Sequence, residues 1–454
     1  MGLDVLNDDH ETQVGSYFVA NYPPFSVWSP QHVPAITSAL DQPHSATDER
    51  RPAPLGLYLH IPFCRKRCKF CYFRVYTDKN SSDVEIYLDA LSREVELYAK
   101  RAALAEREFD FVYFGGGTPS FLSSQQLTGL IDRIRRHWKW EHAREVTFEC
   151  EPGTLKKSKL ETIKAIGTTR LSLGIEHFDD AVLEIGGRAH RSAECFEAYQ
   201  WAREVGFDQI NIDLIAGMVG DTEKKWRDTV EKAIKLDADS VTIYQMEVPH
   251  NTILAREFSA SNEATPVASW ATKRAWVDHA FAAFEAAGYV VSSAYTLAKP
   301  LPDAASTNGD ADRSGFVYRD GLWHGADLVG TGVASFGHVG GVHYQNADSW
   351  EEYIERINRG ELPISRALPI TKEQSLIREM ILQLKLGRLS AGYFKSKFDV
   401  QITERFAKPF SSLVDDGFAE INGDDIRLTR AGLLRVDGLL PRFFEPQFTN
   451  IRYT

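Results

Sequence analysis

The chain has 454 residues, 43% of them hydrophobic and 25% charged, which is an ordinary globular composition with enough apolar material for two or three domains. Its formal net charge of −11 argues against broad nucleic-acid binding, which depends on basic surface. No run of about eighteen apolar residues and no secretory signal is visible, so we expect a cytoplasmic protein without a membrane span.

The first fifty residues contain aromatic residues and prolines but little periodicity, as Tyr22-Pro23-Pro24 and Trp28 illustrate. Periodicity is the main sequence signal for helices and strands. We therefore predict an extended N-terminal arm over residues 1–50, with a polar linker from Gln42 to Pro54. Residues 1–54 form the first of four expected parts.

From Leu55 onward, short β-branched or aromatic runs alternate with longer amphipathic ones. The pattern predicts strands at 55–61, 109–114, 145–151, 170–176, 209–214 and 239–244. It predicts helices at about 82–107, 123–138, 157–166, 191–205 and 222–235. Such alternation indicates an α/β fold with a parallel sheet and right-handed crossovers, either an open doubly wound sheet or a curved partial (β/α)6 barrel.

Alternation within the strands favours the partial barrel. One face of four strands is polar or small: Tyr58 and His60; Thr147, Glu149 and Glu151; Ser172, Gly174 and Glu176; Asn211 and Asp213. The residues between them are apolar. A sheet covered by helices on both faces has near-continuous hydrophobic strands, whereas a curved sheet with helices outside can enclose a polar lumen. Half-exposed antiparallel strands are the alternative, which the intervening helices disfavour.

The regularity declines beyond residue 244. We expect a helix at about 268–287, a strand at 289–295 that could extend the sheet, a loop-like stretch at 299–325 and a glycine-rich stretch at 330–341. Helical runs at 372–387 and 401–416 precede short strands at 418–421 and 425–429 and a last helix, an order that suggests a small winged-helix-like domain. The remaining parts are then the barrel (55–300), an extension with loops (301–364) and a C-terminal domain (365–454).

Three of the five cysteines lie within eight residues, as Cys64, Cys68 and Cys71 in C-x3-C-x2-C spacing after the first strand. Sparse, odd-numbered cysteines do not suggest a disulfide framework. Zinc sites usually close with four ligands in pairs, and no second pair follows, because Cys150 and Cys195 are isolated and typical of core filler. Cubane clusters normally have four thiolates, so three leave one iron open to a substrate. The spacing therefore indicates a [4Fe–4S] cluster.

This loop, placed after the first strand of a six-unit β/α barrel, resembles the radical S-adenosylmethionine (SAM) superfamily. The resemblance implies that SAM chelates the open iron and is cleaved to a 5′-deoxyadenosyl radical. It also implies that Phe70 lies near the adenine and that the Gly115–Pro119 run (GGGTP) contacts the amino group of the methionine moiety. Taken alone, a glycine-rich turn after a strand is weak evidence for SAM binding, because phosphate-binding loops look similar. The Lys-Ser or Lys-Thr that would complete a phosphate-binding loop is missing here.

The resemblance narrows to the oxygen-independent coproporphyrinogen III oxidase, or HemN-like, group. It rests on Tyr58-Leu-His-Ile-Pro-Phe-Cys64, on Phe114 with the GGGTP run and on Asn211-Ile-Asp-Leu-Ile-Ala-Gly217, and extends from Tyr17 nearly to the C-terminus. The implied cosubstrate contacts are Tyr58, Gly116, Gly117, Thr118, Glu149, Arg188 and Asp213. Glu149 and Asp213 also lie on the polar face inferred from alternation. We expect Arg188 to pair with the carboxylate of bound SAM.

Two departures leave the reaction open. The oxidase has a further cysteine where this chain has Phe73, and a glutamine where it has Glu176, which can still accept from a ribose hydroxyl. The leading expectation is oxidative decarboxylation of coproporphyrinogen III propionates in heme biosynthesis. An alternative, favoured by both departures, is a methyltransferase or cyclopropane-forming enzyme that uses two SAM molecules. A heme chaperone (HemW-like) is the third, and the aromatic arm argues against it.

No catalytic residue is assigned, because His60 could be a satisfied core histidine, and Glu151 and Glu176 could act as acid–base groups or hydrogen-bond the cosubstrate. Basic residues crowd the cluster loop: Arg65, Lys66, Arg67, Lys69 and Arg74. They form either a solvated loop or a surface that attracts an anionic substrate or an acidic electron donor such as flavodoxin or ferredoxin. We expect a monomer that binds a small molecule, with no nucleic-acid or membrane partner.

Overall fold

A computed structural model of the chain describes residues 19–43, 53–249, 251–261, 267–300, 315–449 and 451. Six strands lie side by side in chain order and pair in parallel. They are β1 (Leu55–Ile61), β2 (Phe111–Gly116), β3 (Glu145–Cys150), β4 (Arg170–Glu176), β5 (Gln209–Ala216) and β6 (Ser240–Gln245). Each lies within two residues of its predicted position, so the predicted α/β core is confirmed.

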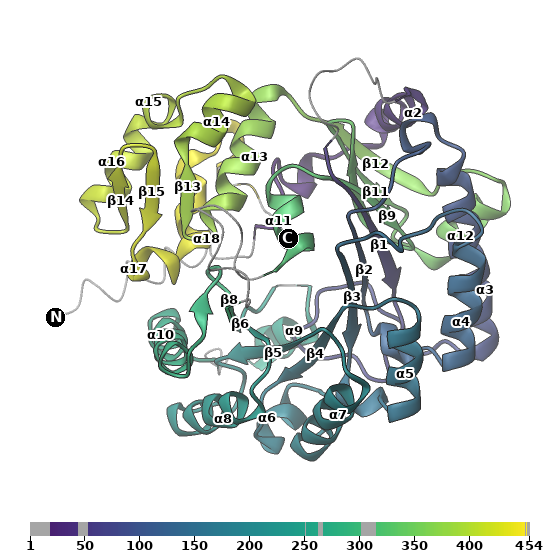
Figure 1. The fold of residues 1–454 in the computed structure, drawn as a ribbon, viewed down its shortest axis with the longest axis horizontal. Coiled ribbons are helices and arrows are strands. Elements are labelled where there is room, and N and C mark those ends of the chain that lie inside the picture. Colours follow the sequence, from purple (N-terminus) through teal and green to yellow (C-terminus); the bar gives the residue numbers. More distant parts are fainter. Residues whose placement is uncertain are drawn as a thin grey trace.

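Helices connect these strands and lie on the outer side of the curved sheet (Figure 1). They are α3 (Ser81–Ala99), α4 (Ser124–Ile134), α5 (Lys157–Ala165), α6 (Asp180–Ile185), α7 (Ser192–Val205) and α8 (Glu223–Leu236). Several begin at a side-chain cap, such as Ser123 with Gln126 at α4, which satisfies free N–H groups of the first turn. Only α6, which is six residues long, was not predicted.

The sheet continues beyond the six parallel strands at both edges. Its order is β12-β11-β10-β9-β1-β2-β3-β4-β5-β6-β8-β7, so it curves without closing. The added strands are β7 (Val290–Val291), β8 (Thr296–Ala298), β9 (Asp327–Thr331), β10 (Phe336–Val339), β11 (Val342–Asn346) and β12 (Ile364–Pro369). Only β9 is parallel to its neighbour β1. The open, mostly parallel sheet confirms the partial barrel.

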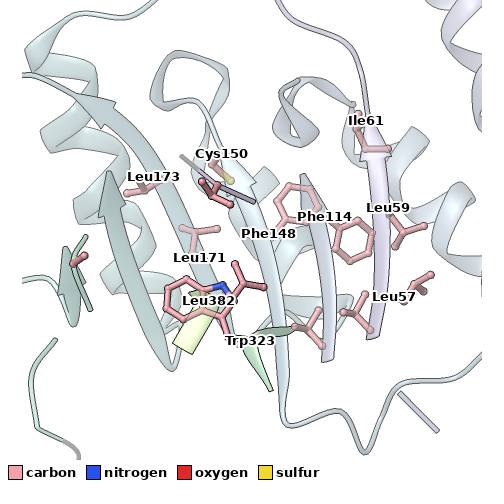
Figure 2. Close-up of a cluster of buried hydrophobic side chains, with 14 of the residues drawn as sticks. Leu57, Leu59, Ile61, Phe114, Phe148, Cys150, Leu171, Leu173, Trp323 and Leu382 are labelled. Atoms are coloured by element: carbon pink, nitrogen blue, oxygen red, sulfur yellow. The ribbon is translucent and has the colours of Figure 1, made fainter. Parts of the chain in front are cut away.

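The predicted division of the strands into two faces is also present. Leu57, Leu59 and Ile61 of β1 are fully buried, and Figure 2 shows them in one hydrophobic cluster with Phe114 and Phe148 of β2 and β3. Burying these side chains under the helices provides the main driving force for the fold. The intervening polar residues point into the lumen, which leaves them available for chemistry.

Three predictions outside the barrel core were wrong in part. The strand expected at 289–295 is two short strands, β7 and β8, that pair with each other antiparallel. The stretch expected to be a loop contains α11 (Val317–Trp323), although residues 301–314 lie outside the described part. The extended arm contains two 3-10 turns and α2 (Val33–Asp41), because Ile36 and Leu40, four residues apart, share one buried face. Residues 1–18 and 44–52 of the arm and linker lie outside the description.

The arm packs against the C-terminal part of the chain. Tyr22 is buried, donates its hydroxyl to Glu445 and lies 5.2 Å from the ring of Phe444. Lys385 donates to the carbonyl of Val19. These contacts bring both ends of the described chain together.

The C-terminal part has its own three-stranded sheet, ordered β13 (Arg388–Ser390), β15 (Asp425–Leu428) and β14 (Ala419–Asn422). The surrounding helices are α13 (Lys372–Leu384), α14 (Ala391–Phe398), α15 (Ile402–Arg405), α16 (Ala407–Asp415), α17 (Arg430–Leu433) and α18 (Val436–Leu439). The predicted helix at 401–416 is split at Phe406, whose backbone leaves helical geometry. The four-part domain division stays a prediction.

Three further helices complete the described fold: α9 (Ile253–Ser261), α10 (Trp270–Ala286) and α12 (Trp350–Asn358). No helix among the described residues has both the length and the apolar character to cross a membrane.

Candidate functional site

Cys64, Cys68 and Cys71 lie on the loop that follows the carboxyl end of β1. Two backbone hydrogen bonds fold this loop back, from Cys64 N to Tyr76 O (3.0 Å) and from Tyr76 N to Pro62 O (2.7 Å). The three thiols are free and partly exposed. Burial raises the pKa of Cys64 to about 11 and that of Cys71 to about 12. Without a metal, Cys64 and Cys71 are therefore protonated at neutral pH, and metal binding would displace their protons.

Two donors from other strands reach the sulfur atoms. Thr118, after β2, donates its hydroxyl to Cys64 Sγ at 3.3 Å, and Arg188 Nη1 donates to Cys68 Sγ at 3.1 Å. Arg188 Nη2 donates to the carbonyl of Gly174 (2.6 Å), and Nη1 lies 3.5 Å from Glu176. Donors and a cation beside sulfur favour its thiolate form, which is the form that binds iron. Thr118 and Arg188 therefore both contact sulfur atoms of the cluster loop, and their contact with a cosubstrate stays a prediction.

Gly116 and Gly117 allow the end of β2 to approach β1. Gly116 has φ +109°, and a Cβ there would overlap the His60 ring. A Cβ on Gly117 would lie 2.8 Å from the backbone of Pro62. The close approach made by these glycines is to the protein's own β1 and cluster loop. Their contact with a cosubstrate stays a prediction.

Three carboxylates share the lumen next to the cluster loop. Glu149 accepts from the Tyr113 hydroxyl (2.6 Å) and Gly116 N (3.3 Å), and Asp213 accepts from Ser172 and Asn211. Burial, followed by the charges of Glu176 and Glu149, raises the pKa of Asp213 to about 8.

Burial also raises the pKa values of Glu149 and Glu176, and Glu176 has a left-handed backbone with φ +65°. The three side chains act on one another electrostatically, so the lumen favours a cationic ligand.

Tyr58 and Phe70 occupy different surroundings. The Tyr58 ring stacks on Tyr113 at 6.0 Å in the lumen, and its hydroxyl lies 3.2 Å from His60 Nδ1. Phe70 packs instead against a small apolar cluster that includes Met218 and Leu254, beside the carboxyl ends of β5 and β6. The predicted site residues thus line the lumen or belong to or contact the cluster loop, and Phe70, which is part of that loop, turns its side chain into this apolar cluster.

Three of the buried polar atoms without partners in the described structure lie at the same end of the sheet. His60 Nε2, Glu151 Oε2 and Arg188 Nε are buried and find no hydrogen-bond partner among the described residues. Native proteins rarely leave such atoms unsatisfied, so each calls for an explanation. A polar ligand seated over the cluster loop would supply the missing partners, and the residues present therefore fit the group that the loop implies.

The three cysteine side chains are not arranged around a common metal position. In the described part of the chain, no set of three or more His, Cys, Asp or Glu side chains is arranged to hold a metal ion. The cluster assignment therefore rests on the loop's spacing, on its two sulfur donors and on the chain's relatives.

Several basic residues of the loop are already engaged. Lys69 pairs with Glu257 at 2.9 Å and Arg74 with Asp348 at 3.6 Å, while Arg65 donates to the carbonyl of Gly153. Arg67 donates to the carbonyl of Cys71. Much of the loop's charge is thus used within the protein, which favours the interpretation of a solvated, structured loop.

The sequence analysis missed three residues of the lumen. His190 is fully buried and lies 2.7 Å from Glu151. Tyr113 hydrogen-bonds Glu149, and Tyr318 of α11 packs 4.2 Å from Tyr113. Alternation within β2 could have identified Tyr113, because it faces the same way as Gly115. Tyr318 had no such signal, since its segment showed no helical pattern.

The fold and this site define the class of protein. Residues 58–233 match the family model described as the Radical SAM superfamily. This match implies a [4Fe–4S] cluster and SAM as cofactors. The number of cysteine ligands is inferred from this chain's own loop.

More narrowly, the chain is similar to two kinds of protein, the oxygen-independent coproporphyrinogen III oxidases and the HemW heme chaperones. It is 27% identical to the oxygen-independent coproporphyrinogen III oxidase of Escherichia coli over 393 residues, 84% of each chain. It is 28% identical to the heme chaperone HemW of Bacillus subtilis over 379 residues, 83% of this chain and 96% of that one. The solved structure of E. coli coproporphyrinogen III oxidase (HemN) superimposes with a TM-score of 0.78 at 24% identity, covering 94% of this chain and 96% of that one.

Proposed function

We propose that this protein is a radical SAM enzyme that cleaves SAM at a [4Fe–4S] cluster held by Cys64, Cys68 and Cys71. One observation carries the proposal. Among the described residues, buried polar atoms of His60, Glu151 and Arg188 find no hydrogen-bond partner at this end of the sheet, where a polar ligand would complete them.

When bound, the cluster supplies one electron that converts SAM to methionine and a hydrogen-abstracting 5′-deoxyadenosyl radical. This chain's residues bind and orient the cosubstrate. Glu149, Glu176 and Asp213 line the lumen, and the sulfonium and ammonium charges of bound SAM would favour the ionised forms of these carboxyl groups. Arg188, which donates to Cys68 Sγ and to the carbonyl of Gly174, would pair with the SAM carboxylate, and its position at the cluster loop supports this role.

The leading reaction is oxidative decarboxylation of coproporphyrinogen III. Hydrogen abstraction from a propionate side chain, loss of carbon dioxide and transfer of one electron to an acceptor leave a vinyl group. Tyr72 and Phe73 follow Cys71, stack at 4.6 Å and are 41% and 46% exposed, so they offer an aromatic surface to a pyrrole ring. The relatives named as coproporphyrinogen III oxidases support this choice.

A second candidate is supported by Phe73 and Glu176. An exposed phenylalanine stands where the oxidase group has a further cysteine, and a carboxylate where it has glutamine. Both changes alter the surroundings of the transferred group rather than the cluster. A methyltransferase or cyclopropane-forming enzyme that uses a second SAM molecule would fit these departures.

The test is anaerobic reconstitution of the full-length protein with iron and sulfide, followed by mass spectrometry after adding SAM, reductant and candidate substrate. Formation of 5′-deoxyadenosine, abolished in Cys68→Ala, supports the radical SAM assignment, and its absence overturns it. Carbon dioxide release from coproporphyrinogen III identifies the leading reaction. A gain of one carbon on a substrate identifies the second candidate, and stoichiometric heme binding without turnover would instead identify a chaperone like the HemW relatives.

We further propose a flavodoxin- or ferredoxin-type electron donor and a monomeric enzyme. The exposed parts of Lys69 and Arg74 leave some positive charge on the cluster loop for an acidic donor. Salt-sensitive reduction by such a donor, compared with salt-insensitive chemical reduction, tests this docking.

A further inference from the structure

A second cavity lies at the opposite end of the sheet from the cluster loop. It has a volume of about 420 Å³ and is enclosed by the end of α2, the β10–β11 turn at Gly340 and Gly341, and helix α13. Asp327, which begins β9, also lines it. The cavity is therefore near the amino end of β1, and the seven-residue strand separates it from Cys64 by roughly 20 Å. Its volume is in the range of small-molecule pockets.

Arg378 of α13 brings an unpaired charge to this cavity. It is only 5% exposed, and its Nε donates to Asn21 Oδ1 at 2.8 Å. Within the described residues, neither Nη1 nor Nη2 has a hydrogen-bond acceptor, and no carboxylate lies within ion-pair distance. Buried guanidinium groups are normally paired, because removing a charge from water is costly unless a partner replaces it.

The other charges that line the cavity neutralise one another. Arg107 pairs with Asp327 at 2.8 Å, and Lys397 pairs with Glu379 at 2.8 Å. Among these five groups, Arg378 alone lacks a counter-ion in the described structure. The cavity therefore has a local excess of one positive charge, in a protein whose overall charge is strongly negative.

His338 also lines this cavity, and the hydrogen bonds around it leave one of its ring nitrogens as an acceptor. His343 Nε2 lies 3.0 Å from the carbonyl of Tyr22, so this nitrogen carries the proton and Nδ1 of His343 is an acceptor. His338 Nδ1 lies 2.9 Å from that acceptor and must donate to it, which leaves His338 Nε2 unprotonated. Burial, with the charges of His343, Arg378 and Lys397, holds the pKa of His338 well below its usual value, so the ring is neutral.

We propose that this cavity binds a small organic anion, with Arg378 holding its carboxylate or phosphate group and His338 Nε2 accepting a hydrogen bond from a hydroxyl of the same ligand. The site is independent of the cluster and of the reaction proposed above. Apolar side chains such as Val339 and Phe398 line the remaining wall and contact the ligand's carbon atoms.

The test uses the full-length protein and isothermal titration with four probes: inorganic phosphate, glycerol 3-phosphate, succinate and malate, with sodium chloride as the ionic-strength control. Binding of the phosphate pair or of the carboxylate pair identifies the anion class. We expect Arg378→Gln to weaken binding by about ten- to a hundredfold. Arg405→Gln is the control. Arg405 of neighbouring α15 is exposed and pairs with Glu373, so its replacement should leave binding unchanged.

Thermal unfolding of the ligand-free protein separates a binding role from a structural one. If Arg378 serves a ligand, Arg378→Met removes an uncompensated buried charge, so the melting temperature without ligand is equal or higher, while the ligand-induced rise is lost. A melting temperature lowered by the substitution, or no binding of any probe by the wild type beyond the chloride control, overturns the proposal. The hydroxyl contact predicts about fivefold tighter binding of malate than succinate, or of glycerol 3-phosphate than phosphate, and equal affinities refute the role of His338.

Discussion

Two groups of buried charge lie on the inner face of the same sheet, and they differ in how completely they are paired. Near the amino ends of β3 and β4, Arg170 bonds Glu145 at 3.1 Å, Ser240 and the carbonyl of Gly315. Glu145 also accepts from Val317 N, Tyr318 N and Thr147. This network satisfies its polar atoms and anchors α11 across the lumen.

At the carboxyl ends, Arg188, Glu151 and His60 each keep one buried polar atom without a partner in the described structure. Complete pairing is what structural networks require, whereas an incomplete network is unfavourable until something fills it. We infer that, of these two groups, the incompletely paired one is the group that binds a ligand. The predictions below test this contrast.

The largest effect should come from the thiols. We expect Cys68→Ala to abolish cluster assembly and SAM cleavage, because it removes one iron ligand together with the acceptor of Arg188. Iron and sulfide content and 5′-deoxyadenosine formation measure the loss. Cys150→Ala is the control, since Cys150 is buried on the helix-facing side and should keep its cluster. Equal cluster content in Cys68→Ala and wild type would remove the assignment.

Substitutions in the fully paired group of Arg170 and Glu145 should lower the stability of the protein and not its activity. Arg170→Met leaves Glu145 buried without its cation, which we expect to cost about 3–5 kcal/mol of unfolding free energy. Urea unfolding measures this cost. The double variant Arg170→Met with Glu145→Gln should recover part of the lost stability, because the uncharged glutamine no longer needs a cation.

Arg188→Met is the matched variant at the unsatisfied end, and we expect it to lose less stability because one of its nitrogens has no partner to lose. Equal losses at the two ends would break the contrast.

Protonation in the lumen gives a third effect, visible in the pH dependence of stability. The pKa of Asp213 is about 8 in the folded protein and near 3.8 unfolded, so between these values the folded state holds a proton that the unfolded state has released. Its contribution to stability is present below about pH 4 and is lost as pH rises towards 8. We expect Asp213→Asn to gain stability relative to wild type over this window, by up to several kcal/mol.

Thermal unfolding of the cluster-free protein across this pH range checks the expectation. Asp208→Asn, at an exposed carboxylate paired with Lys164, should leave the profile unchanged. A difference between Asp213→Asn and wild type that shrinks as pH rises would contradict the assigned burial.

Arg188 should show a smaller effect on cosubstrate affinity. Lysine keeps the charge but lacks the forked donors that reach both Cys68 and Gly174, so we expect Arg188→Lys to weaken SAM binding by about tenfold. Cluster absorbance should change much less than affinity. Arg191→Lys, at a partly exposed arginine paired with Glu184, is the control. Unchanged affinity in Arg188→Lys would remove its contact with the SAM carboxylate.

The sequence predicted the parts of this contrast that depend on local pattern. Strand alternation identified the lumen face of Glu149 and Asp213, and the spacing of Cys64 to Cys71 identified the loop, because both signals lie within a few consecutive residues. Pairing across the chain could not be read in this way. The hydrogen bond from Val317 N to Glu145 joins residues far apart in sequence, and contacts of this kind hold α11 in place although its sequence has no helical periodicity. The surroundings of Arg378, which has no counter-ion in the described structure, likewise depend on residues far away in the sequence.

The smallest effect is expected at Glu176, where the resemblance gives glutamine. Its carboxylate lies 3.5 Å from Arg188 as an ion pair with no hydrogen bond in the described structure, so we expect Glu176→Gln to change SAM affinity by less than about fivefold. Affinity should fall, because one of three lumen carboxylates that favour a cation is removed. Titration of SAM into the reconstituted protein measures it, with Glu184→Gln on the surface as control. If Glu176→Gln lost as much SAM affinity as Arg188→Lys, Glu176 itself would hold the cosubstrate. The glutamate that stands here in place of the family's glutamine would then affect cosubstrate binding and not the choice of reaction.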